Sequence, residues 1–317
     1  MSFELRRDEA IGEGLRRICR KQIEFALAIV AGEDEPDDTP VHETRKHLKK
    51  ARAALRMARK EIGRGLFKRQ DHLLRDVGRL ISDIRDAEVR LQTVRQLQGI
   101  TQRQRHRSYH KVEEMLMLEL ENFLAAYAEW QAQAIPMLTQ ARDEIDNWSV
   151  AQLGPPQLRA AVQETYKCGR DALAEAKASL TPEDFHALRG EAKQLWYQLR
   201  ILRPVNSVVL KNLSDELRAL GDLLGRAHDL SFLGDRLRKE RGRSAFNREG
   251  QELMAVIEAS RSDLQRSAGE LAERFFAERP RDFGGRVSSW LNEWANEKSD
   301  SLAGELVSDG GQSAAFV

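Results

Sequence analysis

Cysteine is nearly missing from this sequence: Cys19 and Cys168 are the only two among 317 residues. Two lone thiols argue against a disulfide framework or a zinc site and fit a reducing cytoplasm. Prolines number only eight, and alternating runs of β-branched residues are scarce, which favours an all-α fold. No run of about 18 apolar residues occurs, and the first ten residues lack the apolar core of a signal peptide. We therefore expect a cytoplasmic globular protein with no membrane span.

A surplus of one charge sign is also lacking, because 51 Lys and Arg balance 50 Asp and Glu. Evenly spread charge would argue against a polyanion partner, but a polyanion responds to local charge. Between Val41 and Arg69 there are eleven basic residues and only two acids, Glu43 and Glu61. This window is therefore the strongest functional signal in the chain.

The first twenty residues of the window predict a helix, since they are rich in Ala, Leu, Lys and Arg and contain no internal Gly or Pro. We expect Thr39 as its N-cap and Pro40 at its first position. Spacings of 3, 4, 3, 4 and 3 place six basic side chains within an arc of about 100°: His42, Arg45, Lys49, Arg52, Arg56 and Arg59. A solvated basic face or an extended anionic partner would each explain this pattern.

The pattern occurs a second time, in HALRGEAKQLWYQLRILR at residues 186–203. With an offset of 144, five basic positions recur as His186, Arg189, Lys193, Arg200 and Arg203, while Trp196 takes the place of Arg52. With an offset of 143, Gly78 falls on Gly221, and Arg85-Asp86 falls on His228-Asp229. A repeat of this length indicates a duplicated domain half.

The motif H-x-x-R-x-x-x-K, present twice and followed by L-x-x-x-x-R-D or L-x-x-x-x-H-D, resembles the CHAD family, the conserved histidine α-helical domain. The resemblance covers about residues 1–280. It implies two related four-helix bundles whose basic helices line a central cavity that binds inorganic polyphosphate, with polyphosphate granules as the location. We expect the halves at 1–150 and 154–280, on either side of LGPPQ, and a partly disordered tail at 281–317.

The resemblance and the basic faces together predict the residues of the site. Arg offers bidentate donors to phosphate, and Lys offers a mobile point charge. The predicted polyphosphate-binding residues are His42, Arg45, Lys46, Lys49, Lys50, Arg52, Arg56, Arg59, His186, Arg189, Lys193, Arg200 and Arg203. The predicted supporting residues are Arg85, Asp86, His228 and Asp229, where each Asp would hold a basic side chain in place. A surface pair is the alternative for Arg85-Asp86. Arg103, Arg105 and Arg107 could contact phosphate or form a loop tip.

Catalytic chemistry has little support in the sequence. His228-Asp229 is an HD dipeptide of the kind found in metal-dependent phosphohydrolases, but the aligned residue Arg85 cannot ligate a metal. Gly-rich phosphate loops and GxSxG elbows are absent. We therefore expect a binding protein that is not an enzyme, without catalytic residues, metal or cofactor. Nucleic-acid binding by the same basic faces and an enzyme acting on phosphate polymers or triphosphates are the alternatives. A homo-oligomer is left open.

Overall fold

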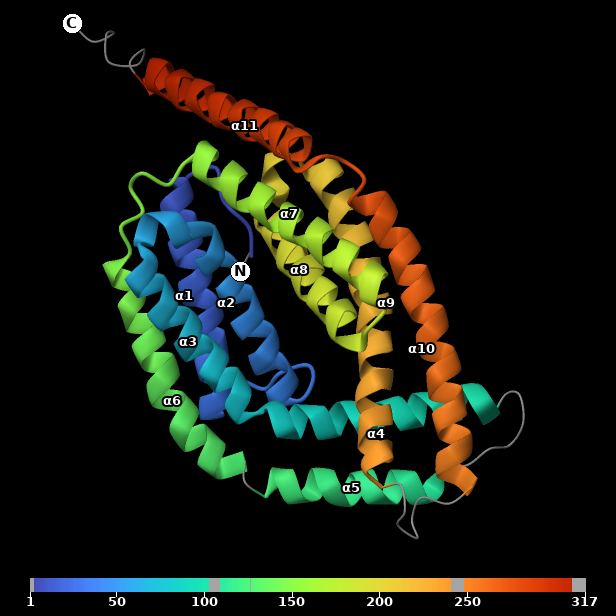
Figure 1. Ribbon diagram of the computed structural model, residues 1–317. Coiled ribbons are helices and arrows are strands. Elements are labelled where there is room, and N and C mark those ends of the chain that lie inside the picture. Colours follow the sequence, from blue (N-terminus) through green and yellow to red (C-terminus); the bar gives the residue numbers. More distant parts are fainter. Residues whose placement is uncertain (1–2, 103–108, 126, 241–247, 310–317) are drawn as a thin grey trace, which may run out of the picture.

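The computed structural model describes residues 3–102, 109–125, 127–240 and 248–309, and every regular element in these ranges is helical (Figure 1). The all-α prediction is thus confirmed. The helices are α1 (Ile11–Ala31), α2 (Pro40–Ile62), α3 (Arg64–Leu80), α4 (Ser82–Gln102), α5 (His110–Leu124), α6 (Tyr127–Asp143), α7 (Pro155–Ser179), α8 (Pro182–Ile201), α9 (Ser207–Lys239), α10 (Arg248–Phe275) and α11 (Pro280–Asp309). None of these described helices has the length and apolar character needed to cross a bilayer.

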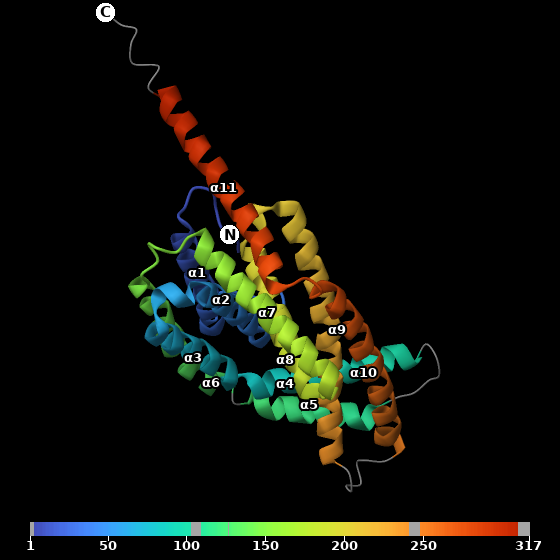
Figure 2. The ribbon, with the colours of Figure 1, turned by 45° about the horizontal axis from the view of Figure 1, so that its top comes forward.

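The helices form two groups that meet at α2 and α8. Helices α1, α2, α3 and α6 pack together, as do α7, α8, α9 and α10, and α2 contacts both α7 and α8 (Figures 1 and 2). One hydrophobic core runs through both groups and includes Leu15 and Ala54 of the first group and Leu188 and Leu195 of the second. The two basic helices therefore lie at the junction of the groups.

Both basic helices begin as the sequence predicts. The Thr39 hydroxyl accepts a hydrogen bond from the His42 N–H at 3.2 Å, and Pro40 occupies the first turn of α2. At α8 the Thr181 hydroxyl accepts from the Asp184 N–H at 3.3 Å, with Pro182 in the first turn. The apolar side of α2 faces the core and includes Leu48, Ala51, Ala54, Leu55 and Ala58. Small alanines let α2 pack closely on α1, while its basic side is left for other contacts.

The apolar pattern of residues 66–98 predicts one continuous helix, but this prediction is wrong, because the chain breaks at Ile81 between α3 and α4. The Ser82 hydroxyl donates to the carbonyl of Arg79 at 2.8 Å, a local bond that competes with helix continuation. Helix α4 then leaves the first group and crosses to α9, accompanied by α5 (Figures 1 and 2). Residues 111–148, whose apolar positions also predict one long helix, are likewise divided into α5 and α6.

The divided helices build a second apolar cluster between the groups. Leu91 and Val94 of α4 and Leu116 of α5 pack with Leu233 of α9 and Leu253 of α10. Those side chains account for the path of α4, since their burial requires partners from the other group. Helices α4 and α5, which precede the predicted boundary between residues 150 and 154, thus complete the core of the second group.

Both ends of the chain differ from the expectations. The predicted tail at 281–317 begins with the packed helix α11, which buries Phe283, Val287, Leu291 and Trp294. These positions are spaced by 4, 4 and 3 residues, so they share one helix face that packs on α7. Residues 310–317 lie outside the described ranges. At the N-terminus, the apolar stripe of the sequence predicts a helix over 3–31, but the helix starts only at Ile11. The preceding segment crosses to α8, where the Leu5 N–H donates to the Ile201 carbonyl at 3.0 Å.

Tyr166 joins α7 to the connection between α10 and α11. Its hydroxyl lies 3.1 Å from the carbonyl of Phe275 and 3.2 Å from that of Glu278, and its ring stacks on Phe283 with centroids 4.1 Å apart. Tyr166→Phe removes this hydrogen bond and is expected to lower the free energy of unfolding by about 1 kcal/mol in urea denaturation. The hydroxyl of Tyr109 is buried without a partner among the described residues, so Tyr109→Phe should be neutral or stabilising. Equal losses from both variants would contradict this account.

Candidate anion-binding site

Cations from α2, α8 and α4 converge around the ammonium group of Lys49. The Lys49 side chain is exposed to solvent, although protein atoms from several helices lie around it. Its pKa is lowered to about 7, first because the surrounding protein replaces water and then because Arg189, Arg45, Lys193 and Arg85 repel the charged form. Predicted residues 140 positions apart in the chain, Lys49 and Arg189, are thereby brought into one electrostatic group.

Two aspartates lie beside this group, one from each half of the repeat. Burial raises the pKa of Asp86, against the opposing influence of Arg45. Burial likewise raises the pKa of Asp229, opposed first by Arg189. Each predicted supporting aspartate therefore lies close enough to its predicted arginine for their charges to interact. The two carboxylates only partly offset the cations around Lys49.

Glycines of the repeat let the basic side chains approach the neighbouring helices. The Arg45 Nη1 donates to the carbonyl of Gly78 at 2.7 Å. A Cβ added at Gly221 would lie 2.9 Å from Cε of Lys193, and one at Gly225 would lie 3.5 Å from Nε of Arg189. Gly221 thus leaves room for Lys193 to lie against α9.

The two histidines of the second half form a pair. Nδ1 of His186 lies 3.2 Å from Nδ1 of His228, and the ring centroids are 4.3 Å apart. One ring must therefore carry its proton on Nδ1 and donate it to the other. The pKa of His228 is lowered to about 4, mainly by burial and then by His186 and Arg189. Burial also lowers the pKa of His186, so the pair is neutral at pH 7 in the free protein.

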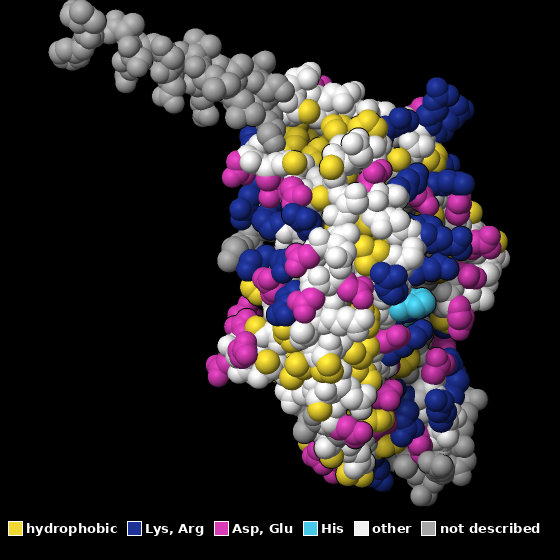
Figure 3. All heavy atoms as spheres, turned by 90° about the vertical axis from the view of Figure 1, so that its left-hand side faces the viewer, with side chains coloured by type: hydrophobic (Ala, Val, Ile, Leu, Met, Phe, Trp, Pro, Cys, Tyr) yellow, Lys and Arg dark blue, Asp and Glu magenta, His cyan; other side chains and the backbone are white. Residues whose placement is uncertain are grey.

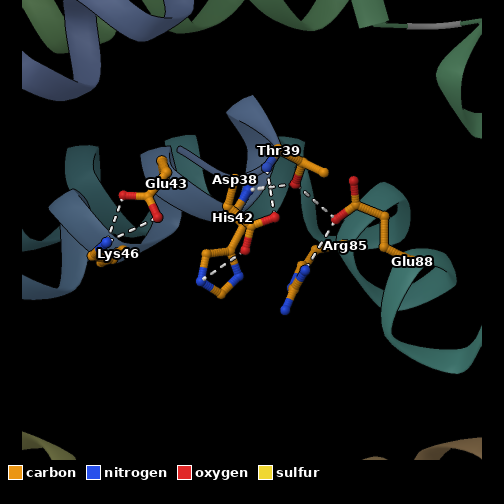
Figure 4. A network of polar contacts seen from close by, with 7 residues as sticks. All are labelled: Asp38, Thr39, His42, Glu43, Lys46, Arg85 and Glu88. Atoms are coloured by element: carbon orange, nitrogen blue, oxygen red, sulfur yellow. Dashed lines mark hydrogen bonds and ion pairs between the residues drawn. The ribbon is translucent and has the colours of Figure 1, made fainter. Parts of the chain in front are cut away.

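A chain of polar contacts links the start of α2 to α4 (Figure 4). The Thr39 hydroxyl donates to Glu88 at 3.3 Å, and Glu88 pairs with Arg85 at 3.1 Å. Nε2 of His42 lies 3.8 Å from the Asp38 carboxylate, and burial followed by the charge of Arg85 lowers the His42 pKa. The predicted residues His42 and Arg85 thus face one another across the junction of α2 and α4.

Several predicted cations have acidic partners, either within α2 or on other elements, which the basic stripe alone does not reveal. Arg52 pairs with Asp71 at 2.8 Å, and Lys46 pairs with Glu43 at 2.7 Å. Longer pairs of 3.8 Å join Arg59 to Glu164 and Arg203 to Glu4. Arg56 lies near Glu191, whose pKa is raised by burial and opposed by that arginine. Around Lys49, Arg85 pairs with Glu88 at 3.1 Å and Lys193 lies 3.9 Å from Asp222. Within the described residues, Arg45, Lys49 and Arg189 form no ion pair with an acid.

Aromatic rings occupy the end of the basic stripes nearest the N-terminal segment. The Phe3 ring has the Lys50 amine 5.7 Å and the Arg200 guanidinium 5.6 Å from its centroid. Trp196 lies between Lys193 and Arg200, at 4.8 and 4.9 Å. These cation–π contacts hold three predicted binding residues in position without neutralising them.

The structure adds basic residues that sequence reasoning missed. A pocket of about 200 Å³ is lined by Arg45, Leu48, Lys49, Arg52, Leu74, Arg75, Gly78, Arg79 and Ser82. Arg75 and Arg79 belong to a segment of mixed charge, in which arginines among acids are typical of structural or solvated positions. Arg75 and Arg79 are four residues apart and so share a helix face near Gly78, and this spacing is the sequence feature that could have identified them. By contrast, basic and acidic side chains alternate over the outer face in Figure 3. Arg103, Arg105 and Arg107 lie outside the described residues.

Metal-ligand geometry occurs at one place among the described residues. Asp38, His42 and Glu43 bring ligand atoms within 4.8 Å of one another. Both Glu43 oxygens already accept from the Lys46 amine, at 2.7 and 2.9 Å. His228 and Asp229 belong to no such group within the described ranges.

This chain is similar to proteins of one known family. A family model described as the CHAD domain matches residues 17–238. The crystal structure of the CHAD domain from the plant Ricinus communis is 18% identical over 85% of this chain and 95% of that chain, with a TM-score of 0.59. PptA from Streptomyces chartreusis is 14% identical over 84% of this chain and 99% of that chain, also with a TM-score of 0.59. No curated protein sequence matches. At these identities, the two structures show a shared fold.

Proposed function

The chain belongs to the CHAD domain family, and we propose that it binds inorganic polyphosphate along the basic residues of α2 and α8. The observation that best supports this proposal is the group of like charges around Lys49, which helps to lower the pKa of Lys49 to about 7 in the free protein. Like charges held together by the fold repel one another, and a dense anion between the helices would relieve that repulsion. We further propose that the two halves of the repeat contribute equivalent arginines, Arg45 and Arg189.

Polyphosphate suits this site better than nucleic acid. Its charges are closely spaced along a narrow chain, and it has no bases to be read. The converging side chains of α2 and α8 are suited to phosphate oxygens, because arginine and lysine donate to them without base contacts. Trp196, the aromatic residue within the second basic stripe, is already covered by Lys193 and Arg200, so a base-stacking platform has little support.

A titration with long-chain polyphosphate over a series of salt concentrations tests the proposal, with duplex DNA as competitor. Neutralising several phosphates releases counterions, so log K should fall linearly with log salt, with a slope of about −0.7 to −0.9 per phosphate contacted. We expect tight binding that DNA at equal phosphate concentration does not displace. Equal competition by DNA would contradict the proposal and favour a nucleic-acid-binding protein.

The proposed role is binding without catalysis, at polyphosphate granules in the cytoplasm. We expect no release of orthophosphate when the protein is incubated with polyphosphate or a nucleoside triphosphate and a divalent metal. A fluorescently tagged protein should coincide with granules in cells that accumulate polyphosphate. Measurable phosphate release that depends on the residues around Lys49 would contradict the non-catalytic role.

A further inference from the structure

The pocket between α2 and α3 has features that an open basic surface does not share. It holds about 200 Å³, smaller than the roughly 300–1,000 Å³ of drug-sized ligand sites. Leu48 and Leu74 line it and are buried in the main core, at 3% and 1% exposure, so they close its inner side. A polymer cannot pass through a pocket that is closed on the inside. A chain end or a small anion can enter it without having to pass through.

The charge of the pocket fits a group more anionic than an internal phosphate. Five cations line it, and two of them are paired: Arg52 with Asp71 at 2.8 Å and Arg79 with Asp76 at 2.9 Å. Nε of Arg75 is shielded from solvent and has no hydrogen-bond partner among the described residues. Together with Lys49 and Arg45, this arginine provides donors for an incoming anion. A terminal phosphate carries close to two negative charges near neutral pH, whereas an internal one carries about one.

The residues of the second half that align with the lining of the α2–α3 pocket carry less positive charge. Trp196 stands where the first half has Arg52, and Asp222 stands where it has Arg79. The Lys193 amine lies 4.8 Å from the Trp196 ring centroid and 3.9 Å from the Asp222 carboxylate, and its Cε lies against Gly221. Arg218, the counterpart of Arg75, is also 3.9 Å from Asp222. The second half thus replaces two cations of the pocket with an indole and an acid.

We propose that the α2–α3 pocket holds the terminal phosphate of a linear polyphosphate chain, with Arg75 and Arg79 as additional binding residues. This inference rests on the proposed polyphosphate function and adds a preference for chain ends in the first half of the molecule. The rest of the chain leaves the pocket past Lys49, toward Arg189 and Lys193.

Isothermal titration of the full chain at constant ionic strength tests this inference with two small probes. Linear tripolyphosphate has two termini, and cyclic trimetaphosphate has three phosphates and none. We expect the linear probe to bind at least about tenfold more tightly. Arg75→Gln/Arg79→Gln should weaken the linear probe about tenfold or more and reduce the difference between the probes. The single variant Arg79→Gln, at a side chain 67% exposed, keeps the test valid if the double variant does not fold.

The matched control is Arg218→Gln/Arg226→Gln, which removes two exposed charges from α9. It should leave binding of the linear probe unchanged. Equal affinity for the two probes, or equal effects of the α3 and α9 variants, would overturn end binding. If long-chain polyphosphate still binds through Arg45 and Arg189, the proposed function stands while this inference fails. If the linear probe binds through Arg75 and long chains do not bind, the proposed function fails instead.

Discussion

Polyphosphate binding is expected to fall by roughly 10²- to 10⁴-fold when Arg45 and Arg189 are both reversed to glutamate. Each arginine contributes charge-assisted hydrogen bonds to phosphate, worth about 1.5–3 kcal/mol apiece. Each also lies beside a supporting acid, Asp86 or Asp229, so a new glutamate adds repulsion of the ligand. The measurement is a titration with long-chain polyphosphate at fixed salt, with circular dichroism and thermal unfolding recorded for each variant.

A matched charge reversal separates local from global electrostatics. Arg142→Glu/Arg266→Glu changes the net charge equally, but it acts at residues paired with Asp143 and Asp263, outside the Lys49 group. We expect this control to weaken binding less than about threefold, because screening limits distant surface charges. The neutral pair Arg45→Gln/Arg189→Gln covers the case in which glutamates unfold the junction. Equal losses in the two reversal variants would show that net charge alone governs binding.

The affinity for polyphosphate is expected to fall about tenfold between pH 6 and pH 8. In the free protein the pKa of Lys49 is about 7. A bound polyanion favours the charged ammonium and raises that pKa, so binding takes up a proton. The contribution is fully present below the free-state pKa of about 7 and is lost progressively as the pH rises from that value toward the higher bound-state pKa. Titrations at constant ionic strength in buffers of different ionisation enthalpy measure both the affinity and the proton uptake.

Lys49→Arg provides the decisive comparison, because arginine stays charged throughout this range. It should bind as tightly at pH 8 as the natural chain does at pH 6, with most of the proton uptake removed. The pKa of Lys50 is lowered to about 8, so Lys50→Arg should change the profile only at higher pH. The pKa values of three histidines of the site are lowered below the usual 6.5, so their protonation affects the binding profile only at more acidic pH. These histidines are His42, His186 and His228. An unchanged pH profile in Lys49→Arg would disprove the assignment.

Local patterns were enough to predict the all-helical fold and the start of each basic helix. The Thr-Pro pairs at 39–40 and 181–182 cap α2 and α8, because the capping hydroxyl and the backbone N–H that donates to it are only three residues apart. The apolar face of α2 also follows from the 3.6-residue period. The repeated motif correctly identified the family, since its spacing fixes which side chains share a helix face. Each of these features depends on residues within a few turns of one another.

Features that depend on long-range contacts were missed. The break at Ile81 and the crossing of α4 arise because Leu91 and Val94 are buried against α9 and α10, far along the chain. The acids that pair with Arg52 and Arg59 come from α3 and α7, so the helix sequence alone overestimated the unpaired charge. The packing of α11 on α7 likewise joins segments that are distant in the sequence.

The amino-acid sequence was sufficient for the helices, their caps and the two basic faces, since each results from short-range periodicity and capping chemistry. Only the tertiary structure decided which basic residues act together, because that depends on how α2, α8 and α4 meet. It places Lys49 among Arg45, Arg189, Lys193 and Arg85, and it joins Arg75 and Arg79 to the same region. Burial at that junction and repulsion between charges from different helices lower the pKa of Lys49, and neither effect can be computed from spacing along one helix.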